Sequence, residues 1–228
     1  MELAKPRIDV GLFTNELEPM LAFWQQQVCL HFDHMIAIGG GVRQHRHEML
    51  GSVLKLNHSR DPLPSEAPSG YSELLIAREG TSSPQTLVDP DGNRILLVPP
   101  GSEGVERIGL RLRVRDLTAH RQFYTRVLGC SPLQDNADAM RCGDSLVLLE
   151  QSDDVTGDAG YRAPGFRYIT LQVFDVDTAH AAALQEGATE GRPPVTMGST
   201  ARVSFIRDPD GNWIELSQRA SVTGKPVA

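Results

Sequence analysis

The feature that most constrains this chain is a sequence motif that occurs twice in similar form, as LVDPDGNRILLVP at residues 87–99 and as FIRDPDGNWIELSQ at residues 205–218. Each copy predicts a strand, a tight turn and a second strand, because proline fixes φ and glycine permits a positive φ within the Asp-Pro-Asp-Gly turn. Residues 8–12 and 108–112, IDVGL and IGLRL, match in the same way. The chain is therefore predicted to be a tandem duplication, and such repeats decide the architecture.

The pattern within each half predicts a small unit of one helix and several strands. Residues 7–57 suggest a strand, a helix with Asn15 at its N-cap, and three further strands. Residues 107–150 repeat this order, with an aspartate at the N-cap. A shorter match, Leu-x-Val-x-Asp at residues 112–116 and 171–175, indicates that the units themselves repeat, so that the chain holds four.

These units predict an α+β chain of two domains, residues 1–100 and 105–219, followed by a tail at residues 220–228. A length of 228 residues is enough for two ordinary cores, and 40% hydrophobic with 22% charged residues is typical of globular proteins. We expect each domain to contain two of the four units.

One helix is missing from the first domain. The stretch between Glu73 and Asp89 is too short to hold the helix and strand that the second domain has at the same place. The strand face that carries Leu74 and Ile76 therefore needs another cover. We expect a second subunit of a homodimer, or the C-terminal tail from Ala220, to pack there.

Charge and composition narrow the partners. A net charge of −7 argues against a nucleic-acid partner. No apolar run approaches the roughly 20 residues of a membrane span, and the first residues lack the apolar core of a signal peptide. The three cysteines, Cys29, Cys130 and Cys142, have no metal-type spacing and predict reduced thiols in a cytoplasmic protein.

The motifs of the second half resemble a known family. The pattern D-L-x5-F-Y-x3-L-G at residues 116–129, then Asp-x-Asp at 175–177 and the second turn phrase, is similar to the vicinal oxygen chelate superfamily. This superfamily includes glyoxalase I, bleomycin-resistance proteins, methylmalonyl-CoA epimerase and extradiol dioxygenases. The resemblance covers residues 107–217 most clearly and extends to residues 7–98. It implies paired βαβββ units that form two open, cup-shaped sheets, with helices outside, a small organic ligand inside and one divalent metal ion in a cup.

The resemblance also implies where metal ligands lie, at one position in the first strand and one in the last strand of each unit. Carried onto this chain, the positions are Asp9, Lys55, Glu73 and Leu96 in the first half, and Gly109, Leu148, Tyr168 and Glu215 in the second. Neither half carries the family's His/Glu ligand set. The sequence therefore leaves open whether a divalent metal ion is the cofactor, and it does not identify the ligands of such an ion.

The strand at residues 42–49 carries the densest polar cluster of the chain, RQHRHE. Alternate residues of a strand share a face, so either His45 and His47 or the set with Gln44 and Arg46 looks into the cup. We expect the histidines to face inward. The alternative is a solvated edge hairpin, since charged residues often protect edge strands.

The candidate catalytic site of the first cup combines this cluster with residues of other strands. Its predicted members are His45, His47, Lys55, Asp9 and Glu73. The histidines would move protons, the lysine would stabilise an enolate or carboxylate, and the carboxylates would balance its charge. His-x-His with one carboxylate is also a metal-binding pattern.

Four further residues are predicted to bind substrate. Asn57 should share the inward face with the lysine, while Glu150, Tyr168 and Glu215 would form a smaller polar site in the second cup. The alternative for Glu215 is a structural ion pair with Arg111 or Arg167.

Three functions are compatible with these features. The first is an isomerase, epimerase or lyase that transfers protons on a small organic substrate in the N-terminal cup. The second is a metal-dependent glyoxalase or ring-cleaving dioxygenase. The third is a drug-sequestering protein that binds without chemistry. The fold alone does not decide between them.

Overall fold

Two mixed β-sheets form the framework of the chain in a computed structural model that describes residues 1–155, 157 and 159–227. One sheet has eight strands in the order β13-β14-β15-β12-β1-β4-β3-β2, and the other has seven in the order β6-β7-β5-β8-β11-β10-β9. The strands of the first sheet are β1 (Leu3–Thr14), β2 (His31–Gly39), β3 (Val42–Met49), β4 (Ser52–Ser59), β12 (Gly165–Val173), β13 (Thr189–Met197), β14 (Ala201–Arg207) and β15 (Trp213–Arg219). Those of the second are β5 (Tyr71–Ala77), β6 (Gln85–Val88), β7 (Arg94–Val98), β8 (Ile108–Val114), β9 (Ser131–Leu133), β10 (Asn136–Cys142) and β11 (Ser145–Gln151).

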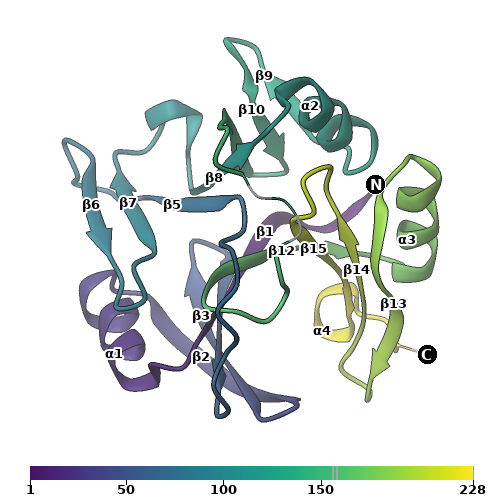
Figure 1. The fold of residues 1–228 in the computed structure, drawn as a ribbon, viewed down its shortest axis with the longest axis horizontal. Helices are drawn as coiled ribbons and strands as arrows, with labels where there is room; N and C mark the ends of the chain where they lie inside the picture. Colours follow the sequence, from purple (N-terminus) through teal and green to yellow (C-terminus); the bar gives the residue numbers. More distant parts are fainter. Residues whose placement is uncertain (156, 158, 228) are drawn as a thin grey trace.

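The helices lie mainly at the periphery, where α1, α2 and α3 flank the strands from outside (Figure 1). They are α1 (Leu17–Ala22), which continues as the π-helical turn η1 (Phe23–Gln27), the 3-10 turn η2 (Ser102–Gly104), α2 (Leu117–Arg126), α3 (Val176–Gln185) and α4 (Ala220–Thr223). Two curled sheets with few helices outside confirm the predicted α+β class and its cup-shaped sheets. Among the described residues, no helix is long and apolar enough to cross a membrane.

The two cups are built across the halves of the chain, which corrects the expectation that consecutive units share a cup. Strand β1 pairs antiparallel with β12, so that Asp9 lies opposite Thr170. Strand β5 pairs antiparallel with β8, with Leu74 opposite Leu110. The first and fourth units therefore form the eight-stranded sheet, and the second and third form the other. The division into residues 1–100 and 105–219 describes the sequence repeat and not the sheets.

The repeated Asp-Pro-Asp-Gly-Asn phrase makes the same turn twice. Asp208 Oδ1 accepts hydrogen bonds from the backbone N–H groups of Asp210 at 3.0 Å and Asn212 at 2.8 Å. Asp89 Oδ1 accepts the equivalent bonds, also at 3.0 and 2.8 Å. The second turn has an additional partner, because the buried His120 places Nε2 3.5 Å from Asp208 Oδ2 and 3.6 Å from Asp210 Oδ2. Burial opposes the charged imidazole, but the hydrogen bond and charge of Asp208, with smaller contributions from neighbouring groups, raise the pKa of His120.

Helix capping follows the sequence in the second half and departs from it in the first. Asp116 caps α2 by accepting hydrogen bonds from the N–H groups of Thr118 and Ala119 at 2.8 and 3.0 Å. The predicted cap at Asn15 is wrong, because α1 begins after Glu16 without a side-chain cap. Asn15 Nδ2 instead donates to the carbonyl oxygen of Ser59 at 2.8 Å, which fastens the start of the helix to the end of β4.

The strand face that lacks a local helix is covered within the chain. Leu74 is fully buried and Ile76 is 3% exposed, and both belong to the core that also contains Phe23 and Trp24 of η1. The expected cover by a second subunit or by the tail is therefore wrong. The tail helix α4 lies against β15 and β1 instead, and Ala228 at its end lies outside the described residues.

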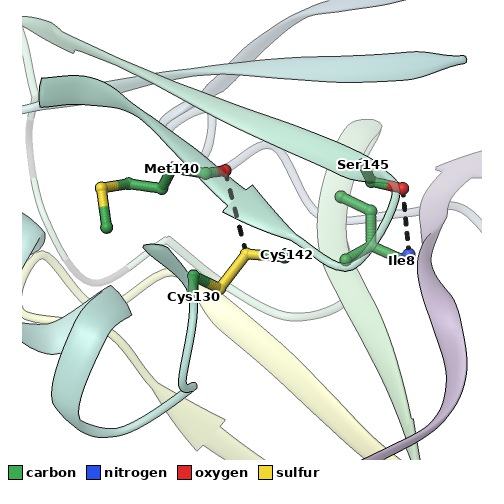
Figure 2. The surroundings of a disulfide bond; sticks show 5 residues. All are labelled: Ile8, Cys130, Met140, Cys142 and Ser145. Atoms are coloured by element: carbon green, nitrogen blue, oxygen red, sulfur yellow. Dashed lines mark hydrogen bonds between the residues drawn. A yellow bond between two sulfur atoms is a disulfide. The ribbon is translucent and has the colours of Figure 1, made fainter. Parts of the chain in front are cut away.

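A disulfide joins Cys130, just after α2, to Cys142 at the end of β10 (Figure 2). The prediction of three reduced thiols is therefore wrong for these two buried residues, while Cys29 is free and exposed. The two cysteines are 12 positions apart in the sequence, and they meet only because β10 returns beside the end of α2. Figure 2 also shows Ser145 Oγ accepting the N–H of Ile8 at 3.2 Å, which ties the two sheets together.

Candidate active site

A cavity of about 700 Å³ opens inside the eight-stranded sheet. Strands β2 and β13, at the two edges of this sheet, provide apolar walls, together with β14. The apolar lining includes Ile36, Ile38, Val195, Met197, Val203 and Phe205. A concave, largely apolar cavity with a few polar groups is the usual form of a small-molecule site.

Lys55 and Glu215 form a buried ion pair at the inner surface of this cavity. Lys55 Nζ lies 3.0 Å from Glu215 Oε2 and 2.6 Å from Thr170 Oγ1. Strand pairing creates the contact, because Thr170 lies beside Glu215 in the parallel ladder of β12 and β15. Burial lowers the pKa of Lys55, although the negative charges of Glu215 and Asp9 oppose that effect. The apolar strand around Glu215 thus tolerates its carboxylate because a cation pairs with it.

Tyr168 closes the cavity next to this pair. Its hydroxyl accepts hydrogen bonds from Asn57 Nδ2 at 3.1 Å and from Gln44 Nε2 at 3.4 Å. Lys55 Nζ lies 5.4 Å from the centroid of its ring. Gly11 makes room for the ring, since a Cβ there would lie 2.2 Å from Tyr168 Cζ. Burial raises the pKa of Tyr168 well above its usual value, so the phenol is neutral.

Two arginines line the same cavity. Arg46 of β3 is only 5% exposed, and its Nη1 donates to Gln44 Oε1 at 2.8 Å. Arg219 at the end of β15 is half-buried, and its pKa is lowered first by burial and then by the positive charge of Arg46. This part of the cavity is therefore strongly electropositive.

An aromatic cluster forms one side of the cavity and its surroundings. The ring centroid of Tyr161 lies 4.9 Å from that of Phe205 and 5.3 Å from that of Trp213. The guanidinium of Arg192, from β13, lies 4.4 Å from the centroid of Tyr161. A flat apolar group could stack here as the guanidinium does.

The histidines predicted to face the cup lie on the opposite face of β3. Gln44 and Arg46 line the cavity, whereas His47 Nε2 lies 3.2 Å from Gln25 Nε2 of η1. Burial, followed by the charge of His45, lowers the pKa of His47 to about 4, and burial also lowers the pKa of His45. The choice of the histidine face is therefore wrong. Both faces of this strand are polar, and so alternation alone did not distinguish them.

The two carboxylates predicted for the catalytic site, Asp9 and Glu73, lie in different sheets. Asp9 lies in the eight-stranded sheet, but its Oδ1 accepts hydrogen bonds from Lys5 Nζ at 2.6 Å and from the N–H of Val53 at 2.8 Å. Glu73 belongs to the other sheet and pairs with Arg94 at 3.2 Å and Arg111 at 3.1 Å. The prediction that Glu73 joins Lys55 in one pocket is therefore wrong.

Glu150 also lies apart from the residues with which it was grouped. It is exposed on β11 of the seven-stranded sheet, whereas Tyr168 and Glu215 belong to the eight-stranded sheet. The alternative pairing of Glu215 with Arg111 or Arg167 is also wrong, because Lys55 is its partner. The structure thus brings Lys55, Asn57, Tyr168 and Glu215 of the predicted site together.

The seven-stranded sheet carries an apolar cluster where its cup would hold a ligand. The cluster consists of Leu75, Val98, Val105, Ala139, Leu146 and Leu148, with Leu96 and Leu133 packed against it. Gly109, another position at which the resemblance implied a ligand, faces Val105, whose Cγ2 would lie 2.8 Å from an added Cβ. Side chains therefore occupy this second cup.

The side chains of the first cup do not fit a divalent metal ion. The four positions implied as ligands there are Asp9, Lys55, Tyr168 and Glu215, and only two are carboxylates. A lysine ammonium has no lone pair with which to bind a metal ion, and here its Nζ already pairs with Glu215. Within the described part of the chain, no group of three or more His, Cys, Asp or Glu residues is arranged to hold a metal.

Comparisons with known proteins agree with this architecture. The family model "Glyoxalase/Bleomycin resistance protein/Dioxygenase superfamily" matches residues 105–216. A "Probable lactoylglutathione lyase" from Vibrio cholerae is 32% identical over 122 residues, which cover 47% of this chain and 86% of that protein.

Solved structures extend the similarity to nearly the whole chain. Glyoxalase I from Zea mays has a TM-score of 0.73 at 15% identity, and the match covers 93% of this chain and 92% of that one. A putative dioxygenase from Bacillus subtilis has a TM-score of 0.68 at 10% identity, covering 92% and 84%. At these identities the structures show a shared fold alone, but the curated relative and the family model show descent: this chain belongs to the glyoxalase/bleomycin resistance protein/dioxygenase superfamily.

Proposed function

We propose that this chain is an enzyme that transfers protons on a small organic molecule in its first cup, with Lys55 and Glu215 in place of a metal centre. The observation that carries the proposal is the buried Lys55–Glu215 pair, 3.0 Å apart, at the surface of the cavity. An acid and a base that lie side by side in a water-poor pocket are the elements of general acid–base catalysis.

The chemistry follows from these two groups. Glu215 removes a proton from a carbon next to a carbonyl, and the electron pair of that C–H bond moves to the carbonyl oxygen. The Lys55 ammonium donates a hydrogen bond to the resulting enolate oxygen and stabilises its charge. Return of the proton to the other face or to a neighbouring carbon completes an epimerisation or isomerisation.

A second candidate function is the sequestering of a ligand without chemistry. It is favoured by the way in which polar groups of the cavity already satisfy one another, since Gln44 Nε2 donates to Asn57 Oδ1 at 2.9 Å and both amides donate to Tyr168. A pocket of this kind binds well but presents few groups that are free to react.

Proton exchange in D2O distinguishes these functions. The test compounds are small α-keto and α-hydroxy acids and S-lactoylglutathione, which the name of the Vibrio relative suggests. We expect NMR to show exchange of the proton next to the carbonyl in the presence of a chelator. Glu215→Gln and Lys55→Met should each slow it by about 10²- to 10⁴-fold.

Two results contradict this proposal. Exchange that requires an added metal ion points to the metal-dependent members of the superfamily. Stoichiometric binding without any exchange, which Glu215→Gln leaves unchanged, supports the sequestering protein instead.

A further inference from the structure

Arg46 and Arg219 line the cavity, and neither forms an ion pair with a described residue. Arg46 Nε is buried and has no hydrogen-bond partner among the described residues. The described part of the chain contains no carboxylate within ion-pair distance of either guanidinium. Removing a charge from water is costly unless a partner of opposite sign compensates, and a buried guanidinium without an ion-pair partner therefore indicates a binding site for an anion.

The charge of the whole lining supports the same conclusion. The chain carries a net charge of −7, yet the described residues that line its cavity include five basic side chains and one carboxylate. The basic residues are Arg46, Lys55, Arg162, Arg192 and Arg219, and the carboxylate is Glu215. Because Glu215 already pairs with Lys55, the arginines leave an electropositive cavity that attracts anions.

The remaining lining indicates what the anion is attached to. Tyr161 and Phe205 present aromatic surface, and Ile36 and Val203 present aliphatic surface. These walls suit an apolar, preferably flat, molecular body.

We propose that Arg46 and Arg219 form an anion site that takes the carboxylate of a small organic acid, with the apolar body of the acid against Phe205 and Tyr161. The guanidinium fork matches the two oxygens of a carboxylate. This inference rests on the proposed function and names its substrate class, an organic monocarboxylate. Arg46 lies opposite Lys55 in the ladder of β3 and β4, so the Lys55–Glu215 pair lies next to the bound carboxylate.

Binding of matched probes to the full chain tests the anion site. The probes are 2-naphthoate, the uncharged 2-naphthamide and 2-naphthyl phosphate, measured by calorimetric titration. We expect the acid to bind at least about 10-fold more tightly than the amide, because charged hydrogen bonds stabilise only the acid. Arg46→Met and Arg219→Met should each weaken naphthoate binding by about 10- to 100-fold and leave the amide unchanged.

The control variant is Arg202→Met. It removes the same charge from neighbouring strand β14, but Arg202 pairs with Asp177 and does not line the cavity. Its naphthoate affinity should equal that of the wild type. Circular dichroism checks folding, and Arg46→Lys provides a second variant that keeps the charge.

Several outcomes overturn the proposal. These are equal affinity for the acid and the amide, a preference for the acid that survives both arginine substitutions, no binding of either probe at millimolar concentration, or a preference for the phosphate. A melting temperature that falls in Arg46→Met would assign this arginine a structural role. Because the titration measures binding and requires no turnover, it tests the anion site separately from proton transfer. Either proposal can therefore fail while the other is supported.

Discussion

Breaking the Lys55–Glu215 pair on one side should destabilise the fold strongly. Lys55 is 3% exposed and Glu215 is 8% exposed, and Lys55 Nζ lies 3.0 Å from Glu215 Oε2. Lys55→Met leaves the Glu215 carboxylate buried without its cation, which costs about 3–5 kcal/mol for a pair of this kind. Glu215→Leu leaves a buried ammonium, with a cost of the same sign. The double variant replaces both charges by apolar groups, and we expect it to be about as stable as the wild type or more stable.

Urea denaturation followed by circular dichroism measures these free energies of unfolding. A natural domain has a stability of about 5–15 kcal/mol, so the loss is large enough to resolve. The exposed pair of Arg202 and Asp177 is the control, because solvent screens it and its removal should change stability far less. The reasoning is refuted if the single variants cost no more than the control, or if the double variant loses the sum of the two single losses.

Three further predictions concern the scaffold. Gly11→Ala should lose about 1–3 kcal/mol of unfolding free energy, because its Cβ would overlap the ring of Tyr168; equal denaturation midpoints would contradict the packing. Reduction of the disulfide, whose cysteines are 12 positions apart, should cost about 3 kcal/mol, measured as the shift in urea midpoint with and without reductant. Because the pKa of His120 is raised, its stabilising contribution is complete below the value of about 6.5 for an unfolded histidine and is lost as pH rises through the folded value. Thermal melts should therefore show that the wild type loses more stability than His120→Gln between about pH 6 and pH 9, and parallel losses would refute the assignment.

Local chemistry made part of the fold predictable. The Asp-Pro-Asp-Gly-Asn turns depend on hydrogen bonds within a few residues, and the cap at Asp116 depends on the first turn of its own helix. The repeats also revealed the unit structure, since each unit brings its own turn and cap. These features were accessible because neighbours in sequence are their main contacts.

Long-range contacts were the part that the sequence did not disclose. The pairing of β1 with β12 joins segments from opposite ends of the chain, and so it moves Glu215 and Tyr168 into the cup of Lys55 and removes Glu73 from it. The disulfide depends on the return of β10 beside the end of α2 in the same manner.

The predicted orientation of β3 was wrong for a different reason. Arg46 and His47 are both polar, and an alternating strand with two polar faces gives no sign of which face is inward. Lys55 was placed correctly because its leucine neighbours fixed the face of β4.

Metal titration of the purified chain tests the central claim most directly, namely that a lysine ammonium stands where a metal ion would be bound. Calorimetry with Zn²⁺, Ni²⁺ and Mn²⁺ compares the wild type with Glu215→Gln. We predict no stoichiometric binding that depends on Glu215, because Lys55 already holds its carboxylate. One tightly bound ion per chain that is lost in Glu215→Gln would contradict the account.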